Sequence, residues 1–161
     1  MKPVYKAVTI VAAVVAVLFV VIIVLGYVGI IRVPGVSPTI LAYSNATELS
    51  QSDVQRILLG AGDVPTIAEM QSYGLTVHGY GTNDSKGTVE NYYEAQIAGW
   101  TQDLSDSGPY WSFTVWRNIG YGFGLAVADN PLLKLSYGYN TAFIVVEGPA
   151  SAWLPMLGQI P

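Results

Sequence analysis

The apolar segment Ala7–Ile31 constrains this chain more than any other feature. Its 25 residues are mainly Val, Ile, Leu and Ala, and the phenol of Tyr27 is their only ionisable group. A helix of this length spans roughly 37 Å, whereas a bilayer core is about 30 Å thick. A cleavable signal peptide has a shorter apolar region and an A-x-A-like site, which Gly29–Val33 does not provide. The segment therefore predicts a single uncleaved transmembrane helix over residues 7–31.

Charges on either side of this segment predict its orientation. Lys2, Lys6 and the amino terminus precede it, whereas Arg32 is the one basic residue that closely follows. The positive-inside tendency places residues 1–6 in the cytoplasm and the chain beyond the anchor outside. Residues 33–161 contain four basic and all 11 acidic residues, hence a formal charge of −7. We expect a single-pass protein that contacts lipid through the anchor and has an extracytoplasmic C-terminal domain.

The composition of the 161-residue chain excludes several classes of protein. It has no cysteine, which excludes a disulfide scaffold, a thiolate metal site and a cysteine nucleophile. The formal charge of −4 has the wrong sign for a nucleic-acid-binding protein, which must neutralise phosphates. The glycine-rich run Gly120–Gly124 lacks the lysine and the following helix of a phosphate-binding loop. We therefore predict no cofactor, no nucleotide and no nucleic acid.

The chain beyond the anchor divides into three parts. Residues 32–46 contain two prolines and a glycine near their start and predict an extended linker. Residues 47–148 predict an α+β extracytoplasmic domain. Residues 149–161 form an apolar tail without charge. We expect this tail to dock on its own domain, with contact to the bilayer or to a partner as alternatives.

Within residues 47–148 the hydrophobic period changes from helical to strand-like. Helices are predicted at about 51–59 and 89–98. Two-residue alternation predicts strands at about 75–80, 111–116, 121–128, 133–137 and 142–147. The predicted fold is a mainly antiparallel sheet of four or five strands with one or two helices on one face. Small residues alternate from Gly122 to Ala128, and we expect this face to let helix 89–98 approach closely.

The run Val89–Thr101 has the sequence VENYYEAQIAGWT. It is similar to the pattern V-x-x-[FY]-Y-x-x-x-[LI]-x-x-G-W of small uncharacterised envelope proteins of archaea and bacteria, usually found behind a transmembrane anchor or a lipid signal. The resemblance covers roughly residues 65–148. It implies an aromatic-rich helix that leads into an antiparallel sheet outside the membrane. The motif is structural, so the resemblance implies no catalytic residue.

Few residues indicate catalysis. His78, the only histidine, lies in a predicted strand without a recognisable serine or carboxylate partner, so a structural or surface role is preferred. Glu90 and Glu94 share one helical face and could move protons or hold a cation, but a solvated face is preferred. A hydrolase of envelope glycans would combine Glu90 with Asp103 or Asp106.

Two polar loops have alternative interpretations. The loops at Asn83–Ser85 and Asp103–Gly108 lack the spacing of an EF-hand, so ordinary turns are preferred over weak external Ca²⁺ sites. Two N-x-[ST] sequons lie in turn-like sequence and make Asn45 and Asn83 candidates for glycosylation.

Aromatic residues give the strongest indication of function. Tyrosine and tryptophan beside glycine and asparagine offer a flat face with a polar edge, which suits sugar stacking or a protein interface. The interior is expected to hold Trp111, Phe113 and Phe123. The predicted ligand or partner surface consists of Trp116, Tyr137, Tyr139 and Trp153.

These observations predict a non-enzymatic, membrane-anchored binding module with a protein or glycan partner, or an accessory subunit of an envelope complex. A carboxylate-dependent hydrolase of envelope glycans is one alternative. A structural spacer or assembly element is the other.

Overall fold

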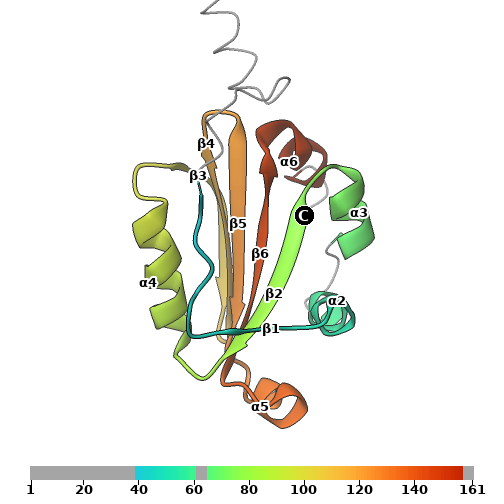
Figure 1. The fold of residues 1–161 in the computed structure, drawn as a ribbon, viewed down its shortest axis with the longest axis vertical. Coiled ribbons are helices and arrows are strands. Elements are labelled where there is room, and N and C mark those ends of the chain that lie inside the picture. Colours follow the sequence, from blue (N-terminus) through green and yellow to red (C-terminus); the bar gives the residue numbers. More distant parts are fainter. Residues whose placement is uncertain (1–38, 61–64, 158–161) are drawn as a thin grey trace, which may run out of the picture.

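The computed structural model describes residues 39–60 and 65–157 (Figure 1). The predicted anchor over residues 7–31 and the first part of the predicted linker lie outside these residues. No helix within the described part of the chain is long and apolar enough to cross a membrane.

The described residues form an antiparallel sheet of six strands in the order β1-β2-β6-β5-β4-β3. The strands are β1 (Thr47–Glu48), β2 (Thr76–Thr82), β3 (Thr101–Gly108), β4 (Trp111–Asn118), β5 (Tyr121–Ala128) and β6 (Thr141–Pro149). The helices are α2 (Gln51–Gly60), α3 (Ile67–Ser72), α4 (Lys86–Gln96), α5 (Pro131–Tyr137) and α6 (Ala150–Leu157). The predicted α+β class with an antiparallel sheet is confirmed, with six strands rather than four or five.

The centre of the sheet follows directly from the apolar pattern. β6 lies between β2 and β5, and its residues Thr141–Val146 are all buried, because helices cover both faces of this strand. β4 and β5 form the predicted hairpin, in which Asn118 pairs with Tyr121 around a two-residue turn. Gly120 occupies this turn with a φ of 71°, a backbone conformation that glycine adopts without steric cost.

Two segments differ from the predictions. Asp103–Gly108, predicted as a loop, belongs to the edge strand β3, which pairs with β4 along its length. Residues 133–137, predicted as a strand, belong to helix α5. The helix begins because the Asn130 side chain accepts a hydrogen bond from the Leu132 amide and Pro131 occupies the first turn, and it ends at Gly138 with a φ of 79°.

Helices cover both faces of the sheet, not one (Figure 1). Helix α4 packs on one face, and α2, α3 and α6 pack on the other. The prediction of a one-sided layer is wrong because the central strands are apolar on both faces. Phe123 and Val145 point toward α4, whereas Ile144 and Val146 point toward the opposite helices. A single helical layer would leave one of these apolar faces in water.

From the sequence we expected the alternating glycines of β5 to face α4, and this expectation is wrong. They face α6, where the Trp153 ring lies directly over them. A Cβ atom on Gly124 would lie 2.5 Å from Cη2 of that ring, and one on Gly122 would overlap it. Helix α4 packs instead against the large alternating side chains Phe123 and Leu125.

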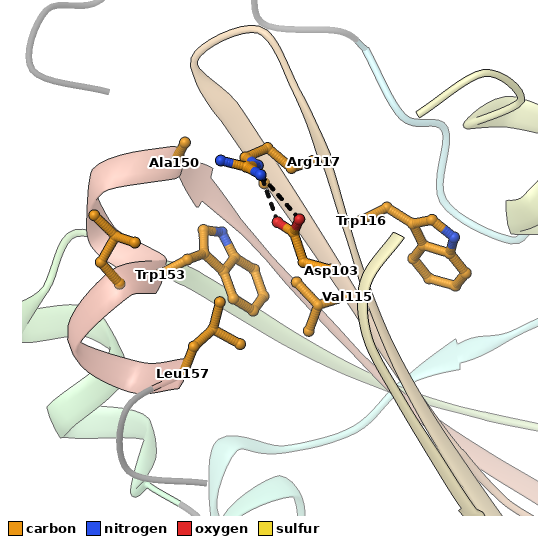
Figure 2. A pocket seen from close by; sticks show the side chains of 9 residues that line it. Asp103, Val115, Trp116, Arg117, Ala150, Trp153 and Leu157 are labelled. Atoms are coloured by element: carbon orange, nitrogen blue, oxygen red, sulfur yellow. Dashed lines mark hydrogen bonds and ion pairs between the residues drawn. The ribbon is translucent and has the colours of Figure 1, made fainter. Parts of the chain in front are cut away.

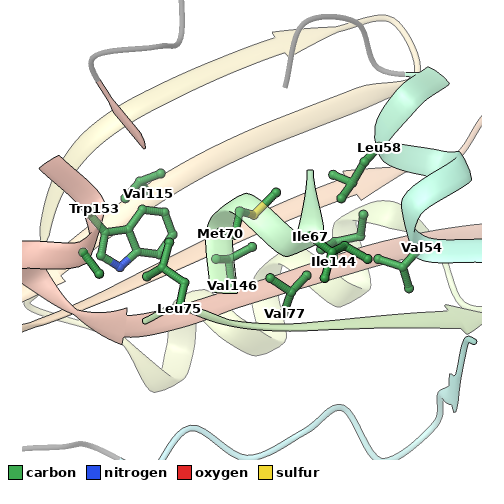
Figure 3. Close-up of a cluster of buried hydrophobic side chains, with 11 residues drawn as sticks. Val54, Leu58, Ile67, Met70, Leu75, Val77, Val115, Ile144, Val146 and Trp153 are labelled. Atoms are coloured by element: carbon green, nitrogen blue, oxygen red, sulfur yellow. The ribbon is translucent and has the colours of Figure 1, made fainter. Parts of the chain in front are cut away.

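Two buried clusters hold these layers together. The cluster beneath α2, α3 and α6 (Figure 3) consists of Val54, Leu58, Ile67, Met70, Leu75, Val77, Val115, Ile144, Val146, Ala152 and Trp153. The cluster beneath α4 consists of Val89, Tyr93, Ile97, Trp116, Phe123, Leu125, Val127, Phe143 and Val145. Ile40, Tyr43 and Ala46 pack against the second cluster, so part of the segment predicted as linker lies on the folded unit.

We call the end of the sheet at which the described chain begins the proximal end, and the opposite end the distal end. At the proximal end, Leu41 exchanges two hydrogen bonds with Gln96 at the end of α4. The start of β3, the β4–β5 turn and the start of α6 lie at this same end, which is uppermost in Figure 1. The β3–β4 turn and α5 lie at the opposite, distal end.

Candidate functional site

Exposed apolar side chains gather at the distal end of the sheet. Four of the large hydrophobic residues that the structure leaves in solvent lie there, and we call them the distal patch: Tyr110, Trp111, Leu132 and Leu135. The leucines are unusually accessible, with 64% of Leu132 and 83% of Leu135 exposed. Exposed aliphatic side chains of this kind, beside aromatic rings, are typical of surfaces that contact another molecule.

The local fold explains why the two leucines face solvent. Helix α5 is short, and Leu133 is the side chain that it buries against the domain. Leu132 and Leu135 are three residues apart, so they lie on one face of α5, away from Leu133. The sequence analysis missed both residues because it treated this segment as a strand. The cap signal of Asn130 and the stop at Gly138 would have placed them on a helix.

The aromatic part of the patch is tied to the same helix. The amide of Asp129, just before α5, donates to the carbonyl oxygen of Tyr110 at 3.0 Å. Trp111 pairs with Ala128 in the sheet, and its ring lies over Gly108, where a Cβ would overlap it. Trp111 was expected in the interior but is exposed. It begins β4 at the distal end, beyond Val115 and Trp116, the residues of this strand that lie in the two buried clusters.

The structure separates the four residues predicted to form one binding surface. Tyr137 ends α5, and Tyr139 lies over Gly81 at the distal end; both are half-buried. Trp116 is only 8% exposed and Trp153 only 3%, and they lie in the clusters on opposite faces of the sheet. The two tryptophans therefore present no ring to solvent, and the four residues do not form one surface.

The carboxylates considered for catalysis are also apart. Glu90 accepts a hydrogen bond from Ser112 and lies 3.6 Å from the Lys86 ammonium, on the α4 face of the sheet. Asp103 pairs with Arg117 at 3.0 Å on the opposite face, where Asp106 also lies by its register with Phe113. The sheet thus lies between Glu90 and either aspartate, and Glu94 is exposed to solvent.

His78 lies on β2, and its Nδ1 is within hydrogen-bonding distance of Oε1 of Glu48 on β1, at 3.1 Å in an exposed setting. Among residues 39–60 and 65–157, no group of three His, Cys, Asp or Glu side chains is placed to hold a metal ion.

A hydrogen-bond cluster around Asp84 joins the start of the described chain to the distal end. The Tyr43 hydroxyl and the Asn45 amide both donate to Oδ2 of Asp84, at 2.6 and 2.7 Å. These hydrogen bonds lower the pKa of Asp84, and the bond to the carboxylate raises the pKa of Tyr43. Both sequon asparagines are exposed, Asn45 within this cluster and Asn83 next to Asp84 in the chain.

A small cavity of about 200 Å³ lies at the proximal end, between α6 and the β3–β4–β5 part of the sheet (Figure 2). Its walls are mainly apolar, and the Asp103–Arg117 ion pair lies at one side. The Trp153 indole N–H next to it is buried and has no hydrogen-bond partner within the described residues. Figure 2 shows Trp116 pointing away on the other side of the sheet.

No family model matches the chain, and no curated protein sequence or solved structure matches it either. Within the sequence itself, one residue, Ala98, separates Ile97 from Gly99, whereas the envelope-protein pattern has two residues at that place.

Proposed function

We propose that this protein is a non-enzymatic, extracytoplasmic binding module, an accessory subunit of an envelope complex, anchored by residues 7–31 and bound to a protein partner through the distal patch. The anchor is proposed from its length and its lack of charge, and the outward orientation from the basic residues that precede it. The weak resemblance to small membrane-anchored envelope proteins agrees with this assignment.

The observation that supports partner binding most directly is the exposure of Leu132 and Leu135 beside Tyr110 and Trp111. Removing an exposed leucine side chain from water contributes about 1.5–3 kcal/mol. Tyrosine and tryptophan are the residues that most often dominate binding energy in protein interfaces. Four such side chains on one end of a small domain can form the core of an interface.

The leucines favour a protein partner over a glycan. Sugars stack on flat aromatic rings and hydrogen-bond to polar groups around them, whereas an aliphatic side chain offers neither a ring nor a polar group. An apolar helix face with residues three apart is instead a common element of protein interfaces. The distal patch therefore supports protein binding better than sugar binding.

The two alternatives receive less support. A hydrolase built on Glu90 with Asp103 or Asp106 needs carboxyl groups about 5–10 Å apart on either side of one bond. The sheet lies between these residues instead. A pure spacer has no need of an exposed apolar patch, which lowers solubility without a compensating contact.

Site-specific photo-crosslinking in the membrane of the cells that make the protein tests this proposal. A photoreactive residue replaces Leu135 in the full-length chain, and the same residue at the exposed Glu94 of α4 is the control. We expect a discrete adduct with another protein from position 135 but not from position 94. Leu132→Asp should abolish the adduct, whereas Gln51→Asp, which alters an exposed side chain of α2 outside both ends, should not.

Three outcomes would contradict the proposal. The first is the same set of adducts from both positions. The second is an adduct from position 135 that survives Leu132→Asp. The third is an adduct containing two copies of this chain, which would replace a partner by self-association.

The anchor has a separate test. Alkaline carbonate should leave the protein in the membrane fraction, and mass spectrometry of the mature chain should find residues 7–31 retained. Protease added to intact cells should degrade the C-terminal domain. Loss of the segment or protection of the domain would overturn the membrane-anchored orientation.

A further inference from the structure

The proximal end of the domain also has exposed apolar side chains, and they differ in their setting from the distal patch. Ile119 occupies the tip of the β4–β5 turn and is 44% exposed, and Leu154 on α6 is 66% exposed. The two elements are joined, because the Ala150 amide at the start of α6 donates to the Gly120 carbonyl oxygen at 3.0 Å. Leu41, where the described chain begins, is exposed at the same end.

Half-buried aromatic side chains accompany these residues. Tyr73 follows α3, Trp100 precedes β3, and Tyr121 begins β5, all at the proximal end. Each is partly accessible. Tyrosine and tryptophan concentrate where a protein meets the headgroup region of a bilayer, because each combines an apolar ring with a polar group.

Charged residues are distributed unequally between the two ends. The proximal segments are 39–41, 72–75, 97–103, 117–122 and 147–157, and they contain three charged residues, Asp103, Arg117 and Glu147. Arg117 is paired with Asp103, and Glu147 is partly buried. The distal segments are 45–48, 82–87, 106–112 and 128–141, and they contain six: Glu48, Asp84, Lys86, Asp106, Asp129 and Lys134. The proximal end is therefore the one that water solvates less favourably.

The position of the proposed anchor selects the same end. Eight peptide units separate Ile31 from Thr39, so they reach at most about 28 Å. The described chain begins at the proximal end, and strands of eight residues extend about 27 Å from there to the distal end. Turning the distal end toward the membrane would use almost the whole linker, whereas the proximal end lies near the membrane without such stretching.

We infer that the proximal end rests on the lipid surface, with Ile119 and Leu154 inserted into the headgroup region. This inference rests on the proposed anchor, and it adds a second, peripheral membrane contact to it. The contact fixes the orientation of the domain, so that the sheet stands on the membrane and the distal patch points away from it. Helix α6 has no charged residue, and it contributes Leu154 to the contact.

The absence of cysteine from the sequence makes the test direct, because single cysteines can be introduced and labelled without background. The full-length chain is prepared with Ile119→Cys, Leu154→Cys or Leu135→Cys, labelled with an environment-sensitive fluorophore, and reconstituted into phosphatidylcholine vesicles. A fraction of the lipids has a nitroxide quencher on the headgroup. The Leu135 label at the distal end is the control, since it also replaces an exposed apolar residue, one that is more exposed than Ile119 or Leu154.

We expect the quencher to reduce the fluorescence of labels at positions 119 and 154 at least about threefold more than at position 135, because an inserted side chain lies within about 5–10 Å of the headgroups. Adding Tyr121→Ser to the chain labelled at 154 tests the role of the neighbouring surface, and this substitution should weaken quenching.

The outcomes separate this inference from the proposed function. Vesicle flotation of the labelled protein reports the anchor, and the pattern of quenching reports the orientation. If the protein floats but position 135 is quenched as strongly as positions 119 and 154, the lipid contact is refuted and the anchor stands. If the protein does not float, the anchor is refuted and the lipid contact with it.

Discussion

The contact between Trp153 and the glycines of β5 is the sharpest structural claim to test, because it can be broken from either side. Gly124→Ala adds one methyl group where the indole ring already lies. The new Cβ would be 2.5 Å from Cη2 and 3.1 Å from Cζ3 of the ring. Ordinary contact between carbon atoms is about 3.5–4.0 Å, so the ring must move by roughly 1 Å.

The magnitude follows from the burial of the ring. Trp153 is 3% exposed, so the ring cannot turn aside into solvent. Overpacking of this kind destabilises by about 1–3 kcal/mol. Replacing glycine in a strand by alanine offsets about 0.5–1 kcal/mol of that amount. We therefore expect Gly124→Ala to lower the free energy of unfolding by about 1–2 kcal/mol, and Trp153→Ala to lower it by about 3–5 kcal/mol.

The decisive measurement is a double-mutant cycle. With the ring removed by Trp153→Ala, Gly124→Ala fills vacated space, and it should become neutral or stabilising by up to about 1 kcal/mol. Urea unfolding of the detergent-solubilised full chain, followed by far-ultraviolet circular dichroism, gives the four free energies. Gly87→Ala is the control, because no atom lies within 4 Å of its added Cβ. We expect it to stabilise the protein slightly.

An equal effect of Gly124→Ala in both backgrounds would refute the reasoning, because the substitution would then act independently of the ring. A Gly124→Ala protein as stable as the original would refute it as well.

Three further predictions concern local stabilisation. The hydrogen bond from Tyr43 lowers the pKa of Asp84 below its ordinary 3.8, so the ionised carboxylate stabilises the folded state above about pH 4 and this contribution is lost as the pH falls through the lowered pKa. Asp84→Asn should therefore lower the urea midpoint at pH 7, and the difference from the original protein should shrink by pH 3; a constant difference would contradict this. Gly138→Ala should destabilise by about 1–2 kcal/mol, because φ is 79° at this position, and Gly138→Asn should destabilise less in the same urea assay. Thr66→Ala removes the N-cap of α3 and should lower stability by about 1 kcal/mol, seen as a fall of a few degrees in the thermal midpoint.

The central strands could be predicted because burial imposes a pattern on them. Residues Ala142–Val146 of β6 are an uninterrupted apolar run, and this part of the strand is covered on both faces. β5 alternates large and small residues, and Phe123 and Leu125 are buried as the alternation predicts. The side chains of a strand in the middle of a sheet are buried, so they must be apolar, and this requirement is visible in the sequence.

The edge strand β3 could not be predicted because nothing covers it. Its sequence, TQDLSDSG, has the composition of a turn, and most of its residues are exposed. Pairing with β4 holds it in place, and backbone pairing leaves no trace in side-chain composition. The register of β3 shifts at Asp103, between Gln102 and Leu104. An irregularity with a charged residue on an edge strand limits pairing of this edge with other chains.

None of the four residues of the distal patch was predicted as part of a binding surface, for a different reason. Tyr137 and Tyr139 drew attention because they are aromatic residues next to glycine, and they do lie at the distal end. Leu132 and Leu135 did not, since leucine is expected in the interior, and a wrong period assigned them to a strand. Whether an aliphatic side chain on a helix is exposed depends on which face of the helix packs against the domain. In α5 the packed face is the one that has Leu133, so Leu132 and Leu135 face solvent.

The glycines of β5 illustrate what a sequence leaves open even when its pattern is interpreted correctly. A row of small residues on one face of a strand predicts that something approaches closely, but it does not name the element that approaches. Helix α4 was the nearest candidate in the sequence, yet the ring of Trp153, 29 residues beyond Gly124, occupies the space. This contact holds α6 against the sheet, and it thereby sets the direction in which Leu154 points. Trp153 was predicted to be part of a binding surface. Because it is buried, it positions its exposed neighbour Leu154 instead. If the lipid contact at the proximal end is correct, the same ring determines which way the distal patch faces.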